Sequence, residues 1–529
     1  MRRRDLPVIP LSPEPIRPGV GPDAQAVHLR LDPVGPGGGP RMGLVTLGCD
    51  KNTVDSEHLM AALVGHGARV SSRIEDSEVV IVNTCGFIEA AKEQSIETIL
   101  EACQLKEEGQ VRAVVAVGCM VQRYKAELQR EIPEVDLFLG LTELTRLVPE
   151  LRSRGLLPGE SELVPNMERP LRVISSETPH TSFLKISEGC DHTCSFCAIP
   201  LMRGLHRSSP VEHLVREARA LELQGVKELN IVSQDTTWYG KDRRRAEKAR
   251  TTGLLPGESP GTGAGEGGLP PSRWEPTHGE APGEGDGGGG KGDSPLLPDL
   301  LRALLDGTSI PWFRLFYMYP SGITPEVTAL LASEPRLLPY LDMPIQHGSD
   351  RILKAMRRPE RRATIRERVR WLREEVPDLT LRTTAMVGFP GETEEDFRIL
   401  LELLEELRFD RVGAFAYSIE DGTPAAGMEG QVPQDVKEER LEALFDVQRE
   451  ISFELNLDQV GKRTVALVDR VVDDDPELAF QARTVGQALD VDGVTNLYAA
   501  PGVSPGDFVE VEIVDALDYD LIGLVRRRL

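Results

Sequence analysis

Hydrophobic positions divide the chain into three patterned regions, the first of which runs from about Met42 to Pro165. Within it, short apolar runs alternate with stretches in which apolar residues recur every three or four positions. The short runs predict buried strands, and the longer spacing predicts helices. Strands that alternate with helices indicate a small parallel sheet. We expect its strands at 42–47, 79–82 and 111–117, and helices that start near 52 and span about 87–108.

The second region, from about Thr181 to Leu457, shows the same alternation of strands and helices over a longer stretch. Six β/α units predict a partial barrel, in which the chemistry lies at the carboxyl ends of the strands. The expected strands are 182–187, 226–232, 312–318, 340–343, 379–387 and 411–417, and the expected helices include 211–224, 361–374 and 394–407.

The third region, about Asp458–Leu529, follows a long helical pattern over 436–455. Strands are expected at 465–472, 479–485 and 508–514, and turn signals stand at Asp492-Gly493 and Pro505-Gly506. This pattern indicates a small all-β unit at the carboxyl end of the sequence.

Two segments lack any apolar periodicity and are rich in Pro and Gly. Such composition cannot bury enough surface to offset the entropy lost on ordering. We therefore expect a disordered extension over 1–41 and a disordered insertion over 241–294, after the second strand of the barrel. Arg243–Arg245 opens the insertion, and a solvated run of charge is favoured there over a contact with ribosomal RNA.

Composition narrows the class of protein. The 529 residues carry 61 basic and 85 acidic side chains, a net charge of −24 that disfavours a general nucleic-acid binder. No apolar run reaches the eighteen residues of a membrane span, and no hydrophobic signal core follows Arg2–Arg4. Seven cysteines are an odd and low number, which argues against a disulfide framework and favours a reducing, cytoplasmic setting.

Three cysteines, Cys190, Cys194 and Cys197, stand on one short loop, separated by three and then two residues. Thiolates are the usual ligands of iron–sulfur clusters, and three of them leave one iron of a 4Fe–4S cube open. An open position is what distinguishes a catalytic metal site from a structural one. The alternative is a zinc knuckle with His192 or a distant residue as the fourth ligand, which is disfavoured because zinc cysteines normally come as two matched C-x2-4-C pairs.

A second set, Cys49, Cys85 and Cys119, directly follows the three expected strands of the first region. Sites in open α/β sheets form beyond the carboxyl ends of the strands, so these cysteines should converge in space. Adjacent glycines would let the backbone approach a cluster closely. The set suggests a second cluster, and the alternative is three buried structural cysteines. Cys103, in the middle of a helix, is interpreted as a core residue.

The loop at 190–197 resembles the signature of radical S-adenosylmethionine (SAM) enzymes, in which the open iron chelates the amino and carboxylate groups of SAM. The resemblance rests on the cysteine spacing, on Phe196 before the last cysteine and on the Ala198-Ile-Pro that follows. It suggests Phe196 as a SAM contact. Gly388 is a second candidate SAM contact, since glycine lets a nucleotide approach the backbone. A glycine that only forms the loop after a strand explains the residue equally well. His347 is interpreted as a structural histidine in preference to a proton shuttle.

The segments Gly48–Glu57, Asn83–Phe87 and Val117–Cys119 are similar to the amino-terminal domain of the methylthiotransferase family. Lys51-Asn52 resembles the branch that acts on a ribosomal protein (RimO) more than the tRNA branch, although Asp50 departs from the proline common there. Similar segments recur at 316–322, 341–347, 387–393, 506–510 and 518–523.

The resemblance implies an α/β fold built from three parts: an amino-terminal α/β methylthiotransferase domain over 42–165, a partial (β/α)6 radical SAM barrel over 176–457 and an all-β TRAM barrel over 458–529. It implies SAM and two 4Fe–4S clusters as cofactors, with the six cysteines as ligands and no catalytic residue assigned beyond them. It also implies an external electron donor and no membrane partner.

The implied reaction is radical methylthiolation of the β-carbon of an aspartate in small-subunit ribosomal protein S-twelve. The alternative substrate is an adenosine of tRNA, and a hypothesis of another class is a non-catalytic, metal-stabilised RNA-binding protein. The last region has fourteen acidic and seven basic residues, a net charge of −7. Such a surface repels a polyanion and attracts a basic protein, which favours the ribosomal protein over tRNA.

Overall fold

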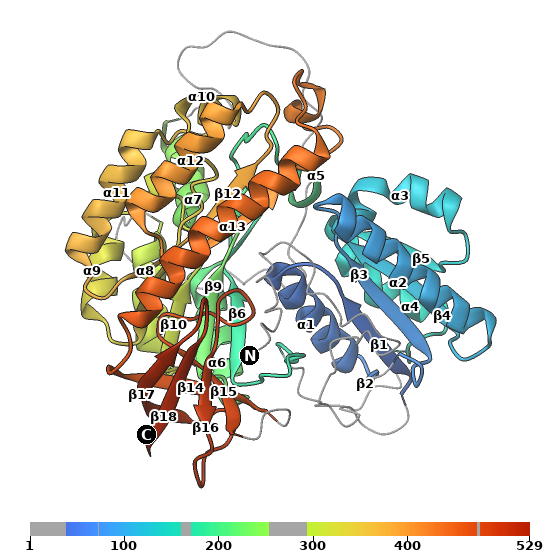
Figure 1. The fold of residues 1–529 in the computed structure, drawn as a ribbon. Coiled ribbons are helices and arrows are strands. Elements are labelled where there is room, and N and C mark those ends of the chain that lie inside the picture. Colours follow the sequence, from blue (N-terminus) through green and yellow to red (C-terminus); the bar gives the residue numbers. More distant parts are fainter. Residues whose placement is uncertain (1–38, 72–73, 160–170, 253–293, 473–476) are drawn as a thin grey trace.

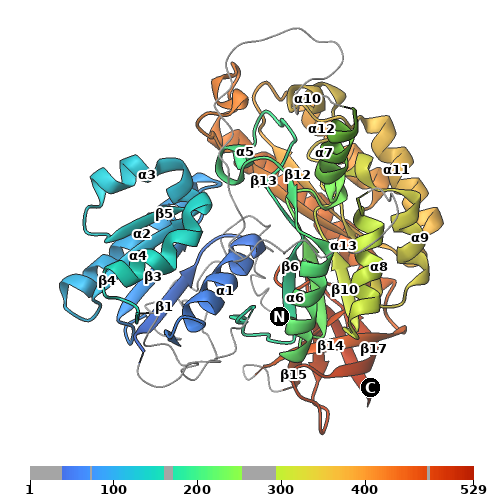
Figure 2. The same cartoon turned by 180° about the vertical axis from the view of Figure 1, so that it is seen from behind.

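The computed structural model describes residues 39–71, 74–159, 171–252, 294–472 and 477–529. An N-terminal sheet with its helices lies beside a larger barrel of strands and helices, and a small β-barrel lies against one end of the larger one (Figure 1). Figure 2 shows the same arrangement from behind, with α6 (Val211–Leu223) and α8 (Leu297–Gly307) on the outside of the large barrel. The predicted fold class is confirmed.

The N-terminal sheet has five parallel strands in the order β2-β1-β3-β4-β5. The two central strands, β3 and β4, are buried along their whole length, because helices cover both faces of the sheet. Val79 and Ile81 pack into one apolar core, whereas Val80 and Val82 pack into the other. The bounds are β1 (Arg41–Thr46), β2 (Arg69–Ser71), β3 (Val79–Thr84), β4 (Ala113–Gly118), β5 (Leu137–Gly140), α1 (Asp50–Val64), α2 (Glu89–Glu107), α3 (Cys119–Glu131) and α4 (Leu147–Ser153).

The large barrel is a six-stranded parallel sheet in the order β13-β12-β11-β10-β9-β6, as the alternation of strands and helices predicts. Its strands are β6 (Thr181–Lys185), β9 (Glu228–Val232), β10 (Trp312–Leu315), β11 (Leu337–Asp342), β12 (Thr380–Val387) and β13 (Arg411–Ala416). Besides α6 and α8, its helices are α5 (Ile199–Arg203), α7 (Lys241–Thr252), α9 (Pro325–Ser333), α10 (Asp350–Ala355), α11 (Arg362–Glu375) and α12 (Glu394–Leu407).

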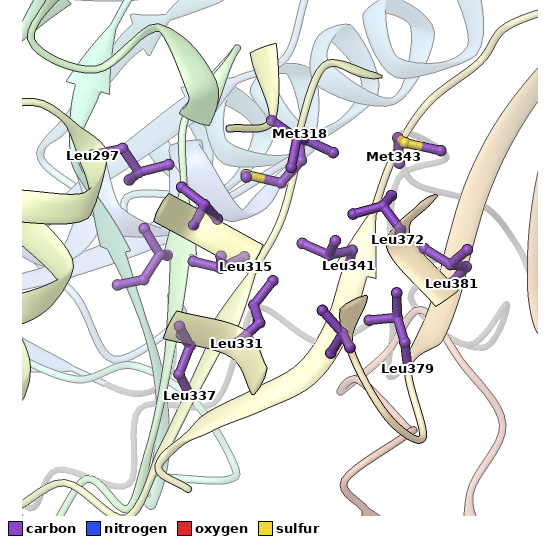
Figure 3. Close-up of a cluster of buried hydrophobic side chains, with 14 of the residues drawn as sticks. Leu297, Leu315, Met318, Leu331, Leu337, Leu341, Met343, Leu372, Leu379 and Leu381 are labelled. Carbon is purple, nitrogen blue, oxygen red and sulfur yellow. The ribbon is translucent and has the colours of Figure 1, made fainter. Parts of the chain in front are cut away.

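The core of this barrel lies between the strands and the surrounding helices. Leu315, Leu341 and Leu381, from three neighbouring strands, belong to the same buried cluster as Leu331 of α9 and Leu372 of α11 (Figure 3). Side chains alternate along a strand, so the neighbours of these leucines face the interior of the barrel.

Three of these interior neighbours, Arg314, Tyr340 and Arg382, are polar, and their hydrogen-bond or ionic partners come from the C-terminal barrel. Arg314 donates to the carbonyl of Val485, and the Tyr340 hydroxyl donates to Asp492 at 2.8 Å. Arg382 lies 3.5 Å from the same aspartate. The C-terminal barrel therefore closes one end of the large barrel.

The C-terminal barrel has five strands in the closed order β14-β15-β16-β18-β17. It follows the long helix α13 (Gln434–Leu457), and its strands are β14 (Arg463–Val471), β15 (Leu478–Thr484), β16 (Thr495–Tyr498), β17 (Phe508–Ala516) and β18 (Leu521–Arg528). Along the described ranges, none of the helices combines the length and the apolar character needed to cross a bilayer.

The predicted disordered insertion over 241–294 is wrong at its start, because Lys241–Thr252 forms α7. The helix is stabilised by contacts that composition does not reveal. Asp242 accepts hydrogen bonds from the amide and hydroxyl of Ser208, and Arg245 pairs with Asp191 at 3.1 Å. Residues 253–293, and the predicted extension up to residue 38, lie outside the described residues.

Candidate active site

The first cysteine triad lies at one edge of the N-terminal sheet, as its sequence positions predict. Cys49 immediately precedes α1, Cys85 follows β3, and Cys119 begins α3. Because β1, β3 and β4 are adjacent and parallel, the loops after them open at the same edge.

Glycines hold the three loops of this triad in close contact. Gly48 has a φ of +93°, and a Cβ atom there would lie 2.8 Å from the Sγ atom of Cys85. Gly118 has a φ of +103°, and a Cβ atom there would lie 2.6 Å from the carbonyl oxygen of Thr84. Only glycine fits both the backbone conformation and the space at these two positions.

Asn52, on the first turn of α1, connects the same loops. Its side-chain amide donates to the carbonyls of Leu47 at 2.7 Å and Thr84 at 3.2 Å. Its Oδ1 atom lies 3.6 Å from the Sγ atom of Cys119. One buried side chain therefore fixes the residues around all three cysteines.

Cys85 and Cys119 are buried, Cys49 is half-buried, and the three thiols are close enough to influence one another. Burial raises the pKa of Cys85 and raises that of Cys119 to about 11, and charge on the neighbouring thiols acts in the same direction. Thiolates gathered in this way repel each other unless a cationic centre lies between them. Free thiols at buried, glycine-lined strand ends fit the ligand set of an iron–sulfur cluster.

The second triad lies on the loop between β7 (Ser187–Glu188) and α5, at the carboxyl end of the first barrel strand. The amide of Cys190 donates to the carbonyl of Gly204, and that of Cys197 donates to Cys194. Ser195 anchors the middle of the loop, because its hydroxyl donates to the carbonyl of Ala355 at 2.8 Å. Burial raises the pKa of Cys190 to about 12 and also raises that of Cys197.

An aromatic stack covers this loop. The imidazole of His192 lies parallel to the ring of Tyr319, with 4.0 Å between the centroids, and its Nε2 atom is 2.6 Å from Asp235. The Tyr319 hydroxyl is 3.3 Å from the Sγ atom of Cys194, and the guanidinium of Arg358 lies 3.9 Å from the Tyr319 centroid. His192 therefore has a carboxylate partner and an aromatic neighbour.

In the described part of the chain, no three His, Cys, Asp or Glu side chains converge as ligands of a single metal ion would. A 4Fe–4S cube takes each thiolate at a different corner, so its ligands surround a larger volume.

The two proposed SAM contacts lie near each other. Phe196 packs against an apolar cluster that includes Phe389, the residue after Gly388. Gly388 has a φ of +72°, and a Cβ atom there would collide with the aliphatic chain of Lys437. Packing is therefore sufficient to require this glycine, and its role toward SAM stays a prediction.

His347 is fully buried, and its contacts fit the structural interpretation. Its Nδ1 atom accepts a hydrogen bond from the amide of Ser349, and its Nε2 atom lies 3.4 Å from Glu392. Burial alone would raise the pKa of Glu392, but His347 and Arg440 lower it.

The two triads meet across the interface between the N-terminal sheet and the large barrel. Cys119 and Leu141 pack in one buried cluster with Ala198 and Met202, which follow the second cysteine loop. The motifs in the sequence indicate the six cysteines, and Asn52 carries part of the family resemblance, but no motif indicates the contacts of Asn52, Tyr319 or Arg358. Tyr319 falls in a segment quoted for its resemblance, whereas Arg358 carries no signal that sequence reasoning could have used.

Comparison with known proteins gives matches in all three parts of the fold. The uncharacterized protein family UPF0004 matches residues 41–140, the radical SAM superfamily matches 287–404, and the TRAM domain matches 460–525. Among solved structures, a radical SAM methyltransferase (TsrM) from Kitasatospora setae aligns over 74% of this chain and 77% of its own, at 14% identity and a TM-score of 0.46.

Two curated relatives align along almost the whole chain. The ribosomal protein uS12 methylthiotransferase RimO of Anaeromyxobacter sp. (strain Fw109-5) is 41% identical over 92% of this chain and 93% of its own length. The RimO of Symbiobacterium thermophilum is 41% identical over 91% and 90%. With this identity along nearly its full length, the chain belongs to the RimO family of radical SAM methylthiotransferases.

Proposed function

We propose that this chain uses SAM and two 4Fe–4S clusters to add a methylthio group to the β-carbon of an aspartate in ribosomal protein uS12. The observation that carries the proposal is the pair of cysteine triads, each with two buried members and one half-buried member, on either side of one interface, where Cys119 packs with Ala198 and Met202. The substrate is supported by the relatives, which are named uS12 methylthiotransferases.

In this proposal Cys190, Cys194 and Cys197 would hold one cluster and leave its fourth iron open to SAM. The other cluster would be held by Cys49, Cys85 and Cys119. When bound, these groups supply the electron that cleaves SAM and the sulfur that is transferred. Phe196 and Gly388 are the proposed SAM contacts, and an external electron donor is a proposed partner.

The chain itself would position these groups and exclude water. The Ser195 contacts fix the second cysteine loop and Tyr319 covers it, which would hold its thiols in place. The C-terminal barrel closes the opposite end of the large barrel through Tyr340 and Asp492. The parts that do this are the proposed domains over 42–165, 176–457 and 458–529.

The substrate is tested by mass spectrometry of ribosomal proteins and tRNA from cells that lack the gene. We expect uS12 to lose a methylthio group at one aspartate while the methylthiolated adenosines of tRNA persist. Loss of the tRNA modification with uS12 unchanged would favour the alternative substrate.

The cofactors are tested by replacing each triad with alanine. Anaerobically reconstituted protein should hold about eight irons, the content of two cubes. The Cys190, Cys194 and Cys197 variant should lose half the iron and all SAM cleavage. The Cys49, Cys85 and Cys119 variant should also lose half the iron but still cleave SAM to deoxyadenosine. Full iron content in the second variant would contradict the second cluster.

A further inference from the structure

Arg203 is the last residue of α5, the short helix that begins two residues after Cys197. Its side chain is 1% exposed and points from the large barrel into the N-terminal part. Its guanidinium donates to the Oδ1 atom of Asn52 at 2.6 Å and to Asp55 at 3.1 Å. It also donates to Glu188, in the strand before the second cysteine loop, at 2.7 Å.

The residues that accept hydrogen bonds from Arg203 lie beside both cysteine triads. Asn52 fixes the residues around Cys49, Cys85 and Cys119 through its bonds to Leu47 and Thr84. Glu188 lies two residues before Cys190. A single planar guanidinium therefore connects the frame of one triad with the loop of the other.

Buried ion pairs fix the geometry of the contacts around Arg203. Lys185 pairs with both Asp55 and Glu188, so two cations and two carboxylates balance one another in a buried setting. Breaking a buried pair leaves an uncompensated charge, and the fork of an arginine cannot be reproduced by a lysine. Lys51 adds a second contact nearby, with its Nζ atom 3.0 Å from the ring centroid of Tyr317.

We propose that Arg203 is a positioning residue that fixes the separation and orientation of the two cysteine triads through Asn52 and Glu188. The inference rests on the proposed function, in which a radical generated beside one triad reacts with sulfur held beside the other. A misplacement of about 1 Å can lower a rate roughly a hundred-fold, so these contacts would control how much SAM cleavage leads to product.

The test compares Arg203→Met and Arg203→Lys with the control Arg123→Met. Arg123 crosses the same interface to Glu420 at 2.9 Å and also lies 3.5 Å from the carbonyl of Gly86, but its hydrogen bonds do not reach residues 50–58. In apoprotein, we expect Arg203→Met to increase hydrogen exchange in residues 50–58, and Arg123→Met to leave that segment unchanged. This measurement needs neither cluster nor substrate.

In reconstituted protein, we expect Arg203→Met to keep the iron content and SAM cleavage of the wild type. The yield of methylthiolated uS12 per deoxyadenosine should fall roughly ten- to a hundred-fold, with partial recovery in Arg203→Lys. The magnetic interaction between the two reduced clusters, seen by electron paramagnetic resonance, should change in parallel.

Unchanged exchange at 50–58, unchanged coupling to product, or loss of iron from one triad would each overturn the proposal. The last result would make Arg203 a residue of cluster binding. Failure of the proposed function looks different, since wild-type protein would then yield no methylthiolated uS12 while the exchange experiment still decides the role of Arg203.

Discussion

At the scale of single residues, the glycines beside the cysteines determine where the thiols lie. Gly48 combines a left-handed backbone, with a φ of +93°, and direct contact with the Sγ atom of Cys85. A methyl group at this position would have to displace a proposed cluster ligand.

We therefore predict that Gly48→Ala loses the N-terminal cluster, which would appear as about half the wild-type iron after reconstitution. Gly109→Ala is the matched control, because Gly109 also has a positive φ, +75°, but open space around the position of a Cβ atom. The Gly109→Ala control should lose only about 1 kcal/mol of stability to backbone strain and keep its iron. Equal iron contents in the two variants would contradict the prediction.

The cysteines could be predicted at this scale because strand ends and spacing are local features of a sequence. The contact between Asn52 and Arg203 could not be predicted, because the two residues lie 151 positions apart and meet only when two separate parts of the fold dock. Tyr319 and Arg358 belong to the same barrel, but they lie 39 positions apart (358 minus 319), so no local pattern indicates their contact. Sequence patterns thus indicate the proposed ligands of the candidate site but not the side chains that hold them.

At the scale of elements, the alternation of apolar runs gave the order of strands and helices, but missed elements whose stability comes from their neighbours. β2 and β5 are only three and four residues long. α7 is strongly polar, and contacts with Ser208 and Asp191 hold it against the second cysteine loop.

We predict that Asp242→Ala lowers the free energy of unfolding by about 1–3 kcal/mol, because the amide and hydroxyl of Ser208 lose their acceptor. Asp306→Ala, on the exposed side of α8, should change it by less than about 0.5 kcal/mol. Chemical denaturation measures both values.

Replacing residues 253–293 by a short Gly/Ser link should leave stability nearly unchanged, because closing a longer or shorter surface loop changes the entropy little. A deletion that starts at 242 should be destabilising, since it removes α7. Equal stability of the two deletions would show that the helix contributes nothing.

Exposed carboxylates recur at every fourth position along α13 and at its C-cap, namely Glu438, Glu442, Asp446, Glu450, Glu454 and Asp458. Like charges four residues apart destabilise a helix by about 0.2–0.5 kcal/mol per pair, and a basic partner would relieve that repulsion. Asp507, Glu510 and Glu512, at and before β17, attract a basic partner less strongly because each is paired with one of Arg526–Arg528. Two of the α13 carboxylates, Asp446 and Glu454, are likewise paired, with Arg449 and Arg408.

We predict that a Glu442→Lys, Glu450→Lys variant binds isolated uS12 more weakly than wild type and with a smaller dependence on salt. Glu374→Lys with Glu375→Lys on α11 makes the same change of charge at another exposed site and should bind like wild type. Titration of each variant with uS12 at several salt concentrations measures the affinity. An equal loss of affinity in both variants would show that only the net charge of the protein matters.

At the scale of the whole molecule, buried ion pairs connect the three parts. Arg172 joins Glu57 of α1 to Glu217 of α6. Arg483 of the C-terminal barrel pairs with Glu228 of β9, which also pairs with Arg314 at 2.9 Å. These contacts bring together residues far apart in the sequence, so no local pattern reveals them.

The ion pairs predict a loss of stability in acid. Burial alone would raise the pKa of Glu217, but His58 and Arg172 lower it, and Arg483 and Arg314 lower that of Glu228. A carboxylate with a lowered pKa binds fewer protons in the folded state, so acid favours the unfolded chain.

The stabilisation is complete above the ordinary carboxylate pKa of 4.5 and is lost as the pH falls below it. Thermal unfolding should therefore occur at similar temperatures at pH 7 and pH 6 and at a clearly lower temperature at pH 3. Glu217→Gln should be less stable at pH 7 and lose less on acidification. Burial raises the pKa of Asp410 and Asp490, so these two groups oppose the loss of stability in acid, equally in the wild type and in Glu217→Gln. An identical acid response in the two proteins would assign it to other groups.

The pairing of Glu228 with both Arg314 and Arg483 also bears on how the chain is made. The second arginine follows the first by 169 positions (483 minus 314). At about 5–20 residues per second, translation takes roughly 8–34 seconds to cover that distance. During that interval, the strand that carries Glu228 has been synthesised but lacks one of its two buried cations. The nascent barrel therefore stays open at the end that the last domain will cover, and we expect chaperones to engage it there until synthesis is complete.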